Sequence, residues 1–250
     1  MKIAIWNIGH FSFGNSPKSA VPEEKLPAAT AAFRRYIASL DADVFAVCEN
    51  TAMFCNADKG PNPGPVFARD ALFDGYTFHY EGAQHRYSAN ALHARVAVAD
   101  MRRKIFACNE SAVITHTDVI RASDYYYLKG TITLDGAPVT LIVCHLAFDM
   151  KRDPDTVNIA QMQELIEVTK DDERVLIAGD LNCRDITTLA LFREAGFSAA
   201  NDGSLVTCPA ASQNKALDHI LVKGLAVKSP AAHETALSDH YALTAEVTLA

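Results

Sequence analysis

The stretch at residues 175–182 places the strongest constraint on the fold of this 250-residue chain. Four apolar residues at 175–178 run into Gly179, which predicts a buried strand that stops abruptly. Side chains two apart in a strand point the same way, so Asp180 and Asn182 are placed to face one site from the end of a central sheet. A β-turn also favours Asp and Asn, because they hydrogen-bond locally there. The rest of the chain decides between the two interpretations.

Other apolar runs end in polar side chains as well. Strands are predicted at residues 2–6, 43–48, 139–144, 217–222 and 241–249. The polar residues that follow or interrupt the apolar runs are Asn7, Glu49, His145, Asp180, Asn182, Asp218, Asp239 and His240. Buried positions rarely hold such groups unless they are paired or bind a metal. Because the set is dispersed over the whole chain, turns do not explain it, and we predict one functional site at a shared sheet edge.

Helices, a meander and two loops connect these strands. The helix predicted after Pro27 keeps Phe33, Ile37 and Leu40 on one face. A second helix is predicted to begin at Thr156, and a third to be capped by Asp185. Short runs predict antiparallel strands at residues 95–99, 104–108, 111–115 and 126–134. Residues 9–27 and 56–65 are predicted to be loops, and with no repeat or linker visible, residues 1–250 are predicted to form a single domain.

Composition indicates an ordinary soluble globular protein, with 49% apolar and 21% charged residues. The net charge of −7 provides no chain-wide basic surface, which weakens without excluding a role in gripping long nucleic acid. A solvated face is the commoner role for short basic groups, although they could contact phosphates. These groups are Arg34 and Arg35, residues 102–104, and Lys151 and Arg152.

The six cysteines form no C-x-x-C pair, so a zinc site is not predicted. The N-terminus does not resemble a secretory signal, and no segment approaches the roughly 20 apolar residues that span a bilayer. We therefore expect a cytoplasmic protein without a membrane span. The oligomeric state is left open by the sequence.

The chemical types in the polar set predict metal-assisted chemistry on phosphate esters. Carboxylates and amides without thiolates suit a hard cation such as Mg²⁺, with Mn²⁺ as an alternative. Two histidines suit proton transfer or phosphate binding near neutral pH. In such a site the metal neutralises the phosphate, a carboxylate holds the attacking water, and a histidine stabilises the developing charge.

The sequence resembles the endonuclease/exonuclease/phosphatase superfamily, the DNase I-like metal-dependent phosphoesterases. The resemblance covers nearly the whole chain and rests on short motifs in a fixed order. These are Ile5-Trp6-Asn7, Val47-Cys48-Glu49, Cys144-His145-Leu146, Gly179-Asp180-Leu181-Asn182, Leu217-Asp218-His219-Ile220 and Ser238-Asp239-His240. It implies an α+β fold, a four-layer α/β/β/α sandwich in which two mixed or antiparallel sheets are flanked by helices.

The resemblance also implies roles for individual residues. On the metal side, Glu49 is the principal Mg²⁺ ligand, Asn7 lies beside it, and Asp239 lies close by. Asn90 resembles a family residue that touches phosphate.

The remaining roles concern the reacting groups. Asp180 orients and activates the water, and Asn182 holds water or phosphate. His240 contacts the scissile phosphate or serves as general base, with Asp218 as its orienting partner. His145 is a candidate to protonate the leaving oxygen.

Departures from the family pattern bear on the substrate. Cys48 stands where the family often has Gln, and the loops at 9–27 and 50–65 resemble nothing we can place. The abasic-site repair branch is disfavoured because it has Tyr in place of His145, while the DNase I, sphingomyelinase and deadenylase branches are more similar. The substrate is expected to be a phosphoester: a nucleic acid, a phospholipid headgroup or a small phosphate ester. The alternative is a non-catalytic phosphoester-binding protein on the same fold.

Overall fold

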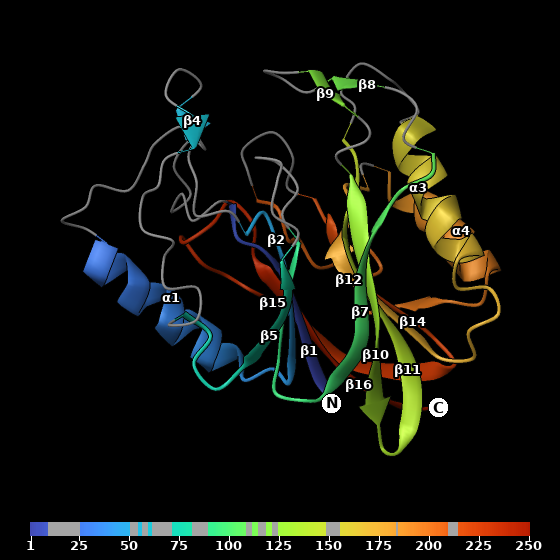
Figure 1. The fold of residues 1–250 in the computed structure, drawn as a ribbon, viewed down its shortest axis with the longest axis horizontal. Coiled ribbons are helices and arrows are strands. Elements are labelled where there is room, and N and C mark those ends of the chain that lie inside the picture. Colours follow the sequence, from blue (N-terminus) through green and yellow to red (C-terminus); the bar gives the residue numbers. More distant parts are fainter. Residues whose placement is uncertain are drawn as a thin grey trace.

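Two six-stranded sheets pack face to face in this protein, and helices lie on their outer sides (Figure 1). The computed structural model describes residues 1–9, 26–50, 55–56, 60–61, 72–81, 90–108, 112–114, 119–121, 125–148, 156–183, 185–209 and 215–250. The arrangement confirms the α+β sandwich that the resemblance implied.

The first sheet is mixed. Its strands lie in the order β15 (Leu225–His233), β16 (Ala242–Leu249), β1 (Lys2–Asn7), β2 (Val44–Cys48), β6 (Ala91–Ala94) and β5 (Thr77–Glu81). The central strand β1 pairs antiparallel with β16 and parallel with β2. As a result, β1 and β2 end at the same edge of the sheet, where Asn7 and Glu49 are found.

The second sheet is mixed as well. Its order is β13 (Ser198–Ala199), β14 (Asp218–Lys223), β12 (Val175–Asp180), β11 (Ala137–His145), β10 (Tyr126–Leu134) and β7 (Val98–Ile105). β11 and β12 are parallel, with His145 opposite Asp180. Two small antiparallel pairs lie outside the sheets: β3 (Cys55–Asn56) with β4 (Gly60–Pro61), and β8 (Ala112–Ile114) with β9 (Val119–Arg121).

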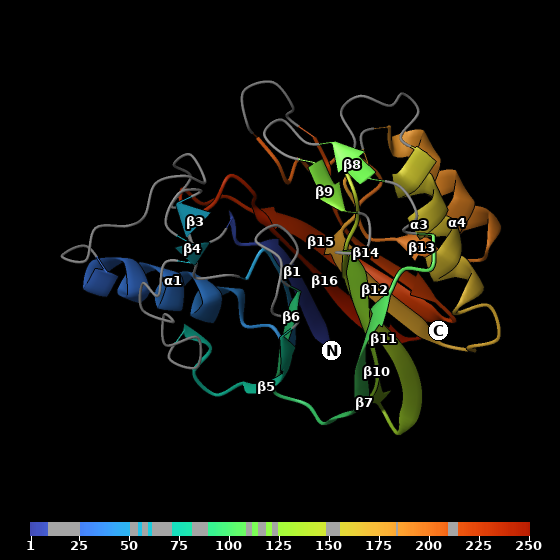
Figure 2. The same ribbon diagram turned by 45° about the horizontal axis from the view of Figure 1, so that its top comes forward.

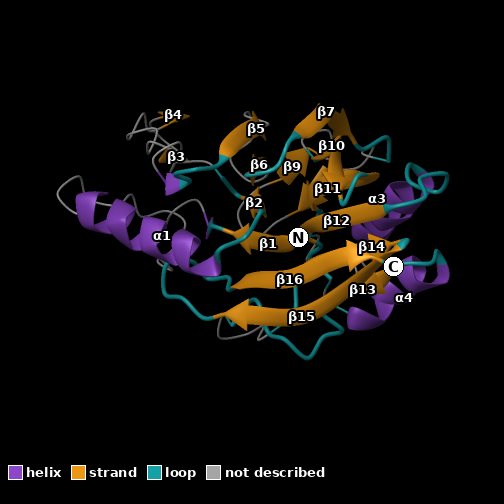
Figure 3. Ribbon diagram, turned by 90° about the horizontal axis from the view of Figure 1, so that it is seen from below, coloured by secondary structure: helices purple, strands orange, loops and turns teal. Residues whose placement is uncertain are grey.

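Strand alternation divides the apolar residues among three cores, one for each space between layers. In β1, Ile3 and Ile5 face the second sheet, while Ala4 and Trp6 face α1 (Leu26–Leu40). The outer face of the second sheet packs on α3 (Thr156–Glu167), the 3₁₀ turn η4 (Ile186–Leu189) and α4 (Ala190–Glu194). Figure 3 shows α1 on one side of the paired sheets and α3 and α4 on the other.

The same alternation positions the site. Ile5 of β1, Val143 of β11 and Ala178 of β12 all belong to the core between the sheets. Two residues later on each strand come Asn7, His145 and Asp180, which therefore point into the same inter-sheet space where the apolar core ends. Figure 2 shows β1 and β12 side by side in the middle of the molecule, where the two sheets face each other.

The limits of several predicted elements need correction. The helix expected after Pro27 already begins at Leu26, the residue before this proline. One strand, β7, replaces the two predicted at 95–99 and 104–108, because a sheet edge tolerates the charged residues between them. Strand β15 was not predicted, since it contains Pro230, which sheets accept at edges. Asp185 caps a helical segment as predicted, accepting a hydrogen bond from Thr187 N, but the segment starts as the 3₁₀ turn η4.

The predicted loops are only partly described. Residues 10–25, and most of 50–65, lie outside the described residues. Within the segment expected to be irregular, the two-residue strands β3 and β4 pair with each other.

Gly179 is required by the close approach of β11 and β12. A Cβ at this position would collide with the carbonyl oxygen and Sγ of Cys144, its partner across the parallel pair. We predict that Gly179→Ala lowers the free energy of unfolding by about 3 kcal/mol, as measured by chemical denaturation. At Gly130 of neighbouring β10, a Cβ would lie 2.9 Å from the flexible Cε of Met101 and 3.1 Å from two backbone atoms, Ala99 O and Met101 Cα, which would have to shift by only a few tenths of an ångström. Gly130→Ala should therefore cost only about 1 kcal/mol, and equal losses for the two variants would contradict the explanation.

Candidate active site

One carboxylate oxygen, Oδ2 of Asp180, is the point on which the predicted site residues converge. Asn7 Nδ2 donates a hydrogen bond to it over 2.9 Å. His145 Nε2 lies 3.6 Å away and His240 Nε2 lies 3.9 Å away. The other oxygen, Oδ1, accepts a hydrogen bond from the backbone N–H of Asn182. Asp180 is almost completely buried, so these neighbours take the place of water around its charge.

Asn7 links this carboxylate to a second one. The same nitrogen that donates to Asp180 also donates to Glu49 Oε1 over 3.2 Å. The amide oxygen of Asn7 accepts from Gly9 N, which fixes the orientation of the side chain. Glu49 itself has a left-handed backbone conformation (φ 54°), which is unfavourable for a residue with a side chain and recurs at functional sites.

The two carboxylates form a donor set that fits a hard cation. Oxygens of Glu49, which is partly buried, and Asp180, which is buried, both lie within hydrogen-bonding distance of Asn7 Nδ2. Two negative charges this close together are stabilised by a positive charge between or beside them. Asp180, Asp218 and His240 also bring their ligand atoms within 4.8 Å of one another. In this second group, however, His240 and Asp218 already bind each other. Glu49 and Asp180 therefore fit an oxygen-ligated ion better.

His240 and Asp218 form a buried ion-pair-like contact. His240 Nδ1 lies 2.8 Å from Asp218 Oδ2, and the Asp218 carboxyl group is completely buried. Burial opposes a charge on His240, but the charge of Asp218 and the hydrogen bond between the two raise the pKa of His240 well above its ordinary value. The imidazole is thereby held with its Nε2 toward Asp180 and is able to carry a proton there.

Backbone contacts from the first sheet hold His240 in place. Trp6 Nε1 donates to the His240 carbonyl oxygen over 3.0 Å. The Ser238 hydroxyl donates to the Asn7 carbonyl oxygen and accepts from His240 N. The turn that carries His240 is thus fixed directly to the strand that carries Asn7.

Helix α3 supports the segments that follow His145 and Asp180. The side-chain nitrogen of Asn158 donates to the carbonyl oxygens of Ala147 and Leu181, over 2.8 and 2.7 Å. Gln161 Oε1 accepts from Ala147 N over 2.7 Å. Both amides are buried, so one face of α3 holds both post-strand segments at a fixed separation. Sequence reasoning missed them because they lie on a helix, and a polar residue among Ile159, Met162 and Leu165 looks like part of a solvent-facing side.

The remaining predicted residues lie around this centre. Asn182 donates from Nδ2 to the Leu146 carbonyl oxygen, so it joins the ends of β11 and β12. Asn90 is fully buried, and its amide donates to the Tyr126 carbonyl oxygen. Asp239 is the exception: its side chain is exposed and accepts a hydrogen bond from Ser238. The structure therefore brings together Asn7, Glu49, His145, Asp180, Asp218 and His240, with Asn90 and Asn182 beside them and Asp239 at the surface.

A third polar residue was also missed. Asn50 follows Glu49 and is completely buried, and neither atom of its amide has a hydrogen-bond partner among the residues that the structure describes. A buried amide without partners is unfavourable and is rare outside sites with a particular function. Its position immediately after a predicted site residue was the available signal.

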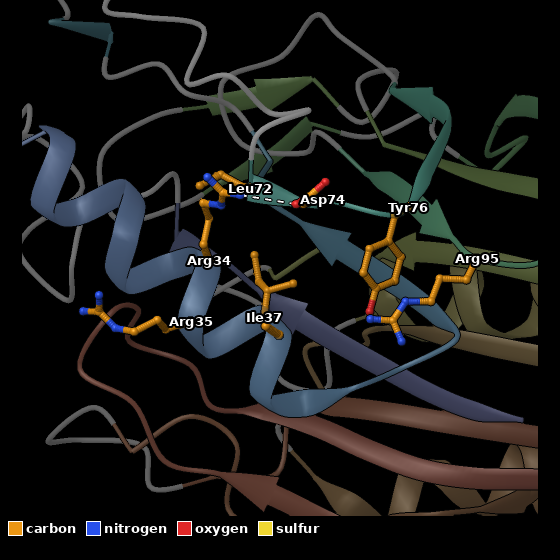
Figure 4. Close-up of a pocket in the computed structure, with 8 residues that line it drawn as sticks. Arg34, Arg35, Ile37, Leu72, Asp74, Tyr76 and Arg95 are labelled. Carbon is orange, nitrogen blue, oxygen red and sulfur yellow. Dashed lines mark hydrogen bonds and ion pairs between the residues drawn. The ribbon is translucent and has the colours of Figure 1, made fainter.

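A separate hollow lies at the other end of β2, away from Glu49. It is lined by Arg34 and Arg35 of α1 together with Asp74, Tyr76 and Arg95 (Figure 4). Arg34 pairs with Asp74, and Arg95 pairs with Asp41 and covers the Tyr76 ring. Because Arg34 and Arg95 are already paired with carboxylates, the described lining of the hollow offers no reactive group comparable to Asp180.

Comparison with known proteins agrees with this geometry. The sequence model described as "Endonuclease/Exonuclease/phosphatase family" matches residues 4–240. The chain belongs to this family. A comparison with curated proteins gives no match.

Solved structures of family members share the fold. Humanized D. rerio TDP2 is 16% identical with a TM-score of 0.67, and the alignment covers 99% of this chain and 98% of that one. An endonuclease/exonuclease/phosphatase family protein from Leptotrichia buccalis C-1013-b is 15% identical with a TM-score of 0.66, and both chains are covered completely (100%). The mannosyl-6-phosphatase of Bacteroides thetaiotaomicron VPI-5482 is 12% identical with a TM-score of 0.63, again with 100% of both chains covered. In the described part of this family member, no helix is long and apolar enough to cross a membrane.

The contacts of Asn158 generate a prediction about stability. Asn158→Asp preserves shape but removes both donors and sets a carboxylate against two carbonyl oxygens in a buried place. We expect the free energy of unfolding to fall by about 3 kcal/mol in chemical denaturation. Gln163→Glu makes the same amide-to-acid change at an exposed position of α3 and should alter stability by less than about 0.5 kcal/mol. An Asn158→Asp protein as stable as the Gln163→Glu control would show that α3 does not clamp the two segments.

Proposed function

We propose that this protein is a Mg²⁺-dependent phosphoester hydrolase, with Mn²⁺ as a possible substitute, in which a water on the metal side attacks the phosphorus atom. The observation that carries the proposal is the convergence of Asn7, His145 and His240 on Asp180 Oδ2. Carboxylate, amide and imidazole groups gathered around one buried oxygen supply the three requirements of phosphoester hydrolysis: a water acceptor, charge stabilisation and a proton donor.

Glu49 and Asp180 would hold the cation, with Asn7 keeping their oxygens at a fixed separation. When bound, the ion supplies Lewis-acid stabilisation of the negative charge on the phosphate. Asp239 is exposed and accepts a hydrogen bond from Ser238, so in this proposal its part on the metal side is an outer one.

The chain's own groups then move the protons. Asp180 orients the water and accepts its proton as the new P–O bond forms. His240, held by Asp218, stabilises the phosphate oxygens with a positive charge. The P–O bond to the leaving group breaks, and His145 is placed to donate a proton to the departing oxygen. Both Nε2 atoms lie beyond good hydrogen-bonding distance of Asp180, so each can bond to an oxygen atom of substrate or water without breaking a hydrogen bond to Asp180.

Structural relatives support two kinds of substrate. One solved structure is D. rerio TDP2 complexed with a single-strand DNA product, 15% identical with a TM-score of 0.66, and 99% of this chain and 98% of that chain are covered. Another is the mannosyl-6-phosphatase named above, which favours a small phosphate ester. Single-stranded nucleic acid is the substrate class that we favour.

Removal of the central carboxylate tests the catalytic proposal. Asp180→Asn should lower kcat for bis(p-nitrophenyl) phosphate about a thousandfold, because the water loses its acceptor and the site loses a charge. Asp171→Asn removes a carboxylate from an exposed turn and should leave kcat unchanged. Near-normal activity in a folded Asp180→Asn protein, as judged by thermal unfolding, would refute the role of Asp180.

The metal proposal has a test that does not depend on turnover. Mg²⁺ or Mn²⁺ should raise the Tm of the wild-type protein by several degrees, because a ligand of the folded state stabilises it. EDTA should reverse the shift and abolish hydrolysis. Glu49→Gln should remove most of the shift, while Glu167→Gln, an exposed change on α3, should retain it. An equal shift in both variants would place the ion elsewhere.

The competing interpretation is a phosphoester-binding protein without turnover. Isothermal calorimetry separates the two. Heat from binding of a diester, with no product detected in the presence of Mg²⁺ or Mn²⁺, would favour the binding protein over the hydrolase.

A further inference from the structure

Arg103 is a cation near the candidate active site for which the described residues provide no anionic partner. It lies on β7, the edge strand of the second sheet, and its guanidinium covers the Tyr126 ring at 4.8 Å from the ring centroid. Its Nε is buried and has no hydrogen-bond partner, and no carboxylate of the described residues pairs with it. A guanidinium carries five N–H donors and no acceptor atom, so it is suited to bind an anion.

Strand pairing places Arg103 on the side of the sheet that faces the site. Arg103 pairs with Leu128 of β10, and Leu128 belongs to the core between the sheets. Arg103 therefore points to the inter-sheet side, as His145 does. Tyr126 comes directly before Tyr127, the partner of Cys144, so the Tyr126 ring lies next to the end of β11.

A chain of contacts joins Arg103 to the predicted phosphate-binding residue. The Tyr126 hydroxyl accepts a hydrogen bond from Asn90 N over 2.8 Å, and the Tyr126 carbonyl oxygen accepts from Asn90 Nδ2. Asn90 comes directly before β6, whose first residue pairs with Val47 near the end of β2. Arg103 and Asn90 thus both contact Tyr126, at the end of the inter-sheet space where the site residues lie.

The surface beside Arg103 is also apolar. Ile105 pairs with Tyr126 and lies on the same face of β7 as Arg103, and its side chain is 54% exposed. A cation next to an exposed apolar side chain matches a nucleotide, whose phosphate is charged and whose sugar and base present apolar faces. β7 is two strands away from β11, which corresponds to about 10 Å. At this separation from β11, we expect the Arg103 side chain to bind a phosphate next to the scissile one and not the scissile phosphate itself.

We propose that Arg103 binds a second phosphate of the substrate, on the side of the site marked by Asn90 and Tyr126, and that the substrate is therefore a single-stranded nucleic acid. The inference rests on the proposed hydrolase function. It explains how a chain with net charge −7 holds a polyanion: a local cation is presented at the site in place of a basic surface.

The test compares a substrate with many phosphates and a substrate with one. A short single-stranded DNA oligonucleotide and bis(p-nitrophenyl) phosphate are hydrolysed by wild type, Arg103→Gln and Arg102→Gln. Arg102 is the matched control, because it pairs with Lys129 and points to the opposite face of the same strand. For the oligonucleotide, Arg103→Gln should raise KM about tenfold. The slope of log KM plotted against log salt concentration should fall by about one, the value for one lost phosphate contact. Its kinetics with bis(p-nitrophenyl) phosphate, and those of Arg102→Gln with both substrates, should stay close to wild type.

Each other outcome overturns the proposal. An equal rise in the KM for the oligonucleotide in Arg103→Gln and Arg102→Gln indicates a non-specific effect of positive charge. An equal loss of activity toward both substrates in Arg103→Gln indicates that Arg103 only supports the fold of the site. Hydrolysis of the single diester without hydrolysis of DNA refutes the nucleic-acid assignment and leaves the hydrolase intact, whereas hydrolysis of neither refutes both. If Arg103→Gln does not fold, Arg103→Met keeps an apolar cover on Tyr126 without the charge and gives the same comparison.

Discussion

The hydrogen bond from Asn7 Nδ2 to Asp180 Oδ2 is the contact on which the arrangement of the site depends, because it joins the two sheets where their shared apolar core ends. A buried carboxylate is unfavourable unless donors or cations surround it. Asp180 meets this requirement with groups from both sheets, so its burial depends on the relative position of the sheets. Sheet packing and site chemistry are therefore linked through one residue on each side.

The rest of the network extends this link outward. Trp6 and Ser238 attach the turn of His240 to β1, and Asn158 attaches the ends of β11 and β12 to α3. The donors are buried, so loss of an acceptor exposes the protein to the cost of an unsatisfied polar group. A site held this way needs little rearrangement when charge develops, which is the property that electrostatic catalysis requires.

The sequence was sufficient to predict the parts that follow from strand periodicity. Apolar runs that end in Asn7, His145 and Asp180 predicted strands whose ends meet; the sandwich itself was implied by the family resemblance, and the fold confirms it. Asp239 shows the limit of this reasoning: it adjoins His240, but its neighbour Ser238 is the residue that turns inward and binds both Asn7 and His240. Asn158 and Gln161 were beyond reach because their hydrogen-bond partners are backbone groups of Ala147 and Leu181, which are distant in the chain and carry no signal in their side chains. Long-range backbone hydrogen bonds leave no pattern in a single sequence.

The distances around Asp180 distinguish two classes of contact. Asn7 and the N–H of Asn182 hold this carboxylate at 2.9 Å, and Asp218 holds His240 at 2.8 Å, whereas Nδ1 of His145 has no hydrogen-bond partner among the described residues. The two imidazole Nε2 atoms stay 3.6 and 3.9 Å from the same carboxylate oxygen, too far for good hydrogen bonds although the rings are almost fully buried. The site thus combines short supporting contacts on Asp180 and His240 with two imidazole Nε2 atoms that make no good hydrogen bond to that carboxylate. In the proposed hydrolase, each Nε2 can therefore bond to a phosphate oxygen, and Asp180 to the attacking water, without loss of a supporting contact.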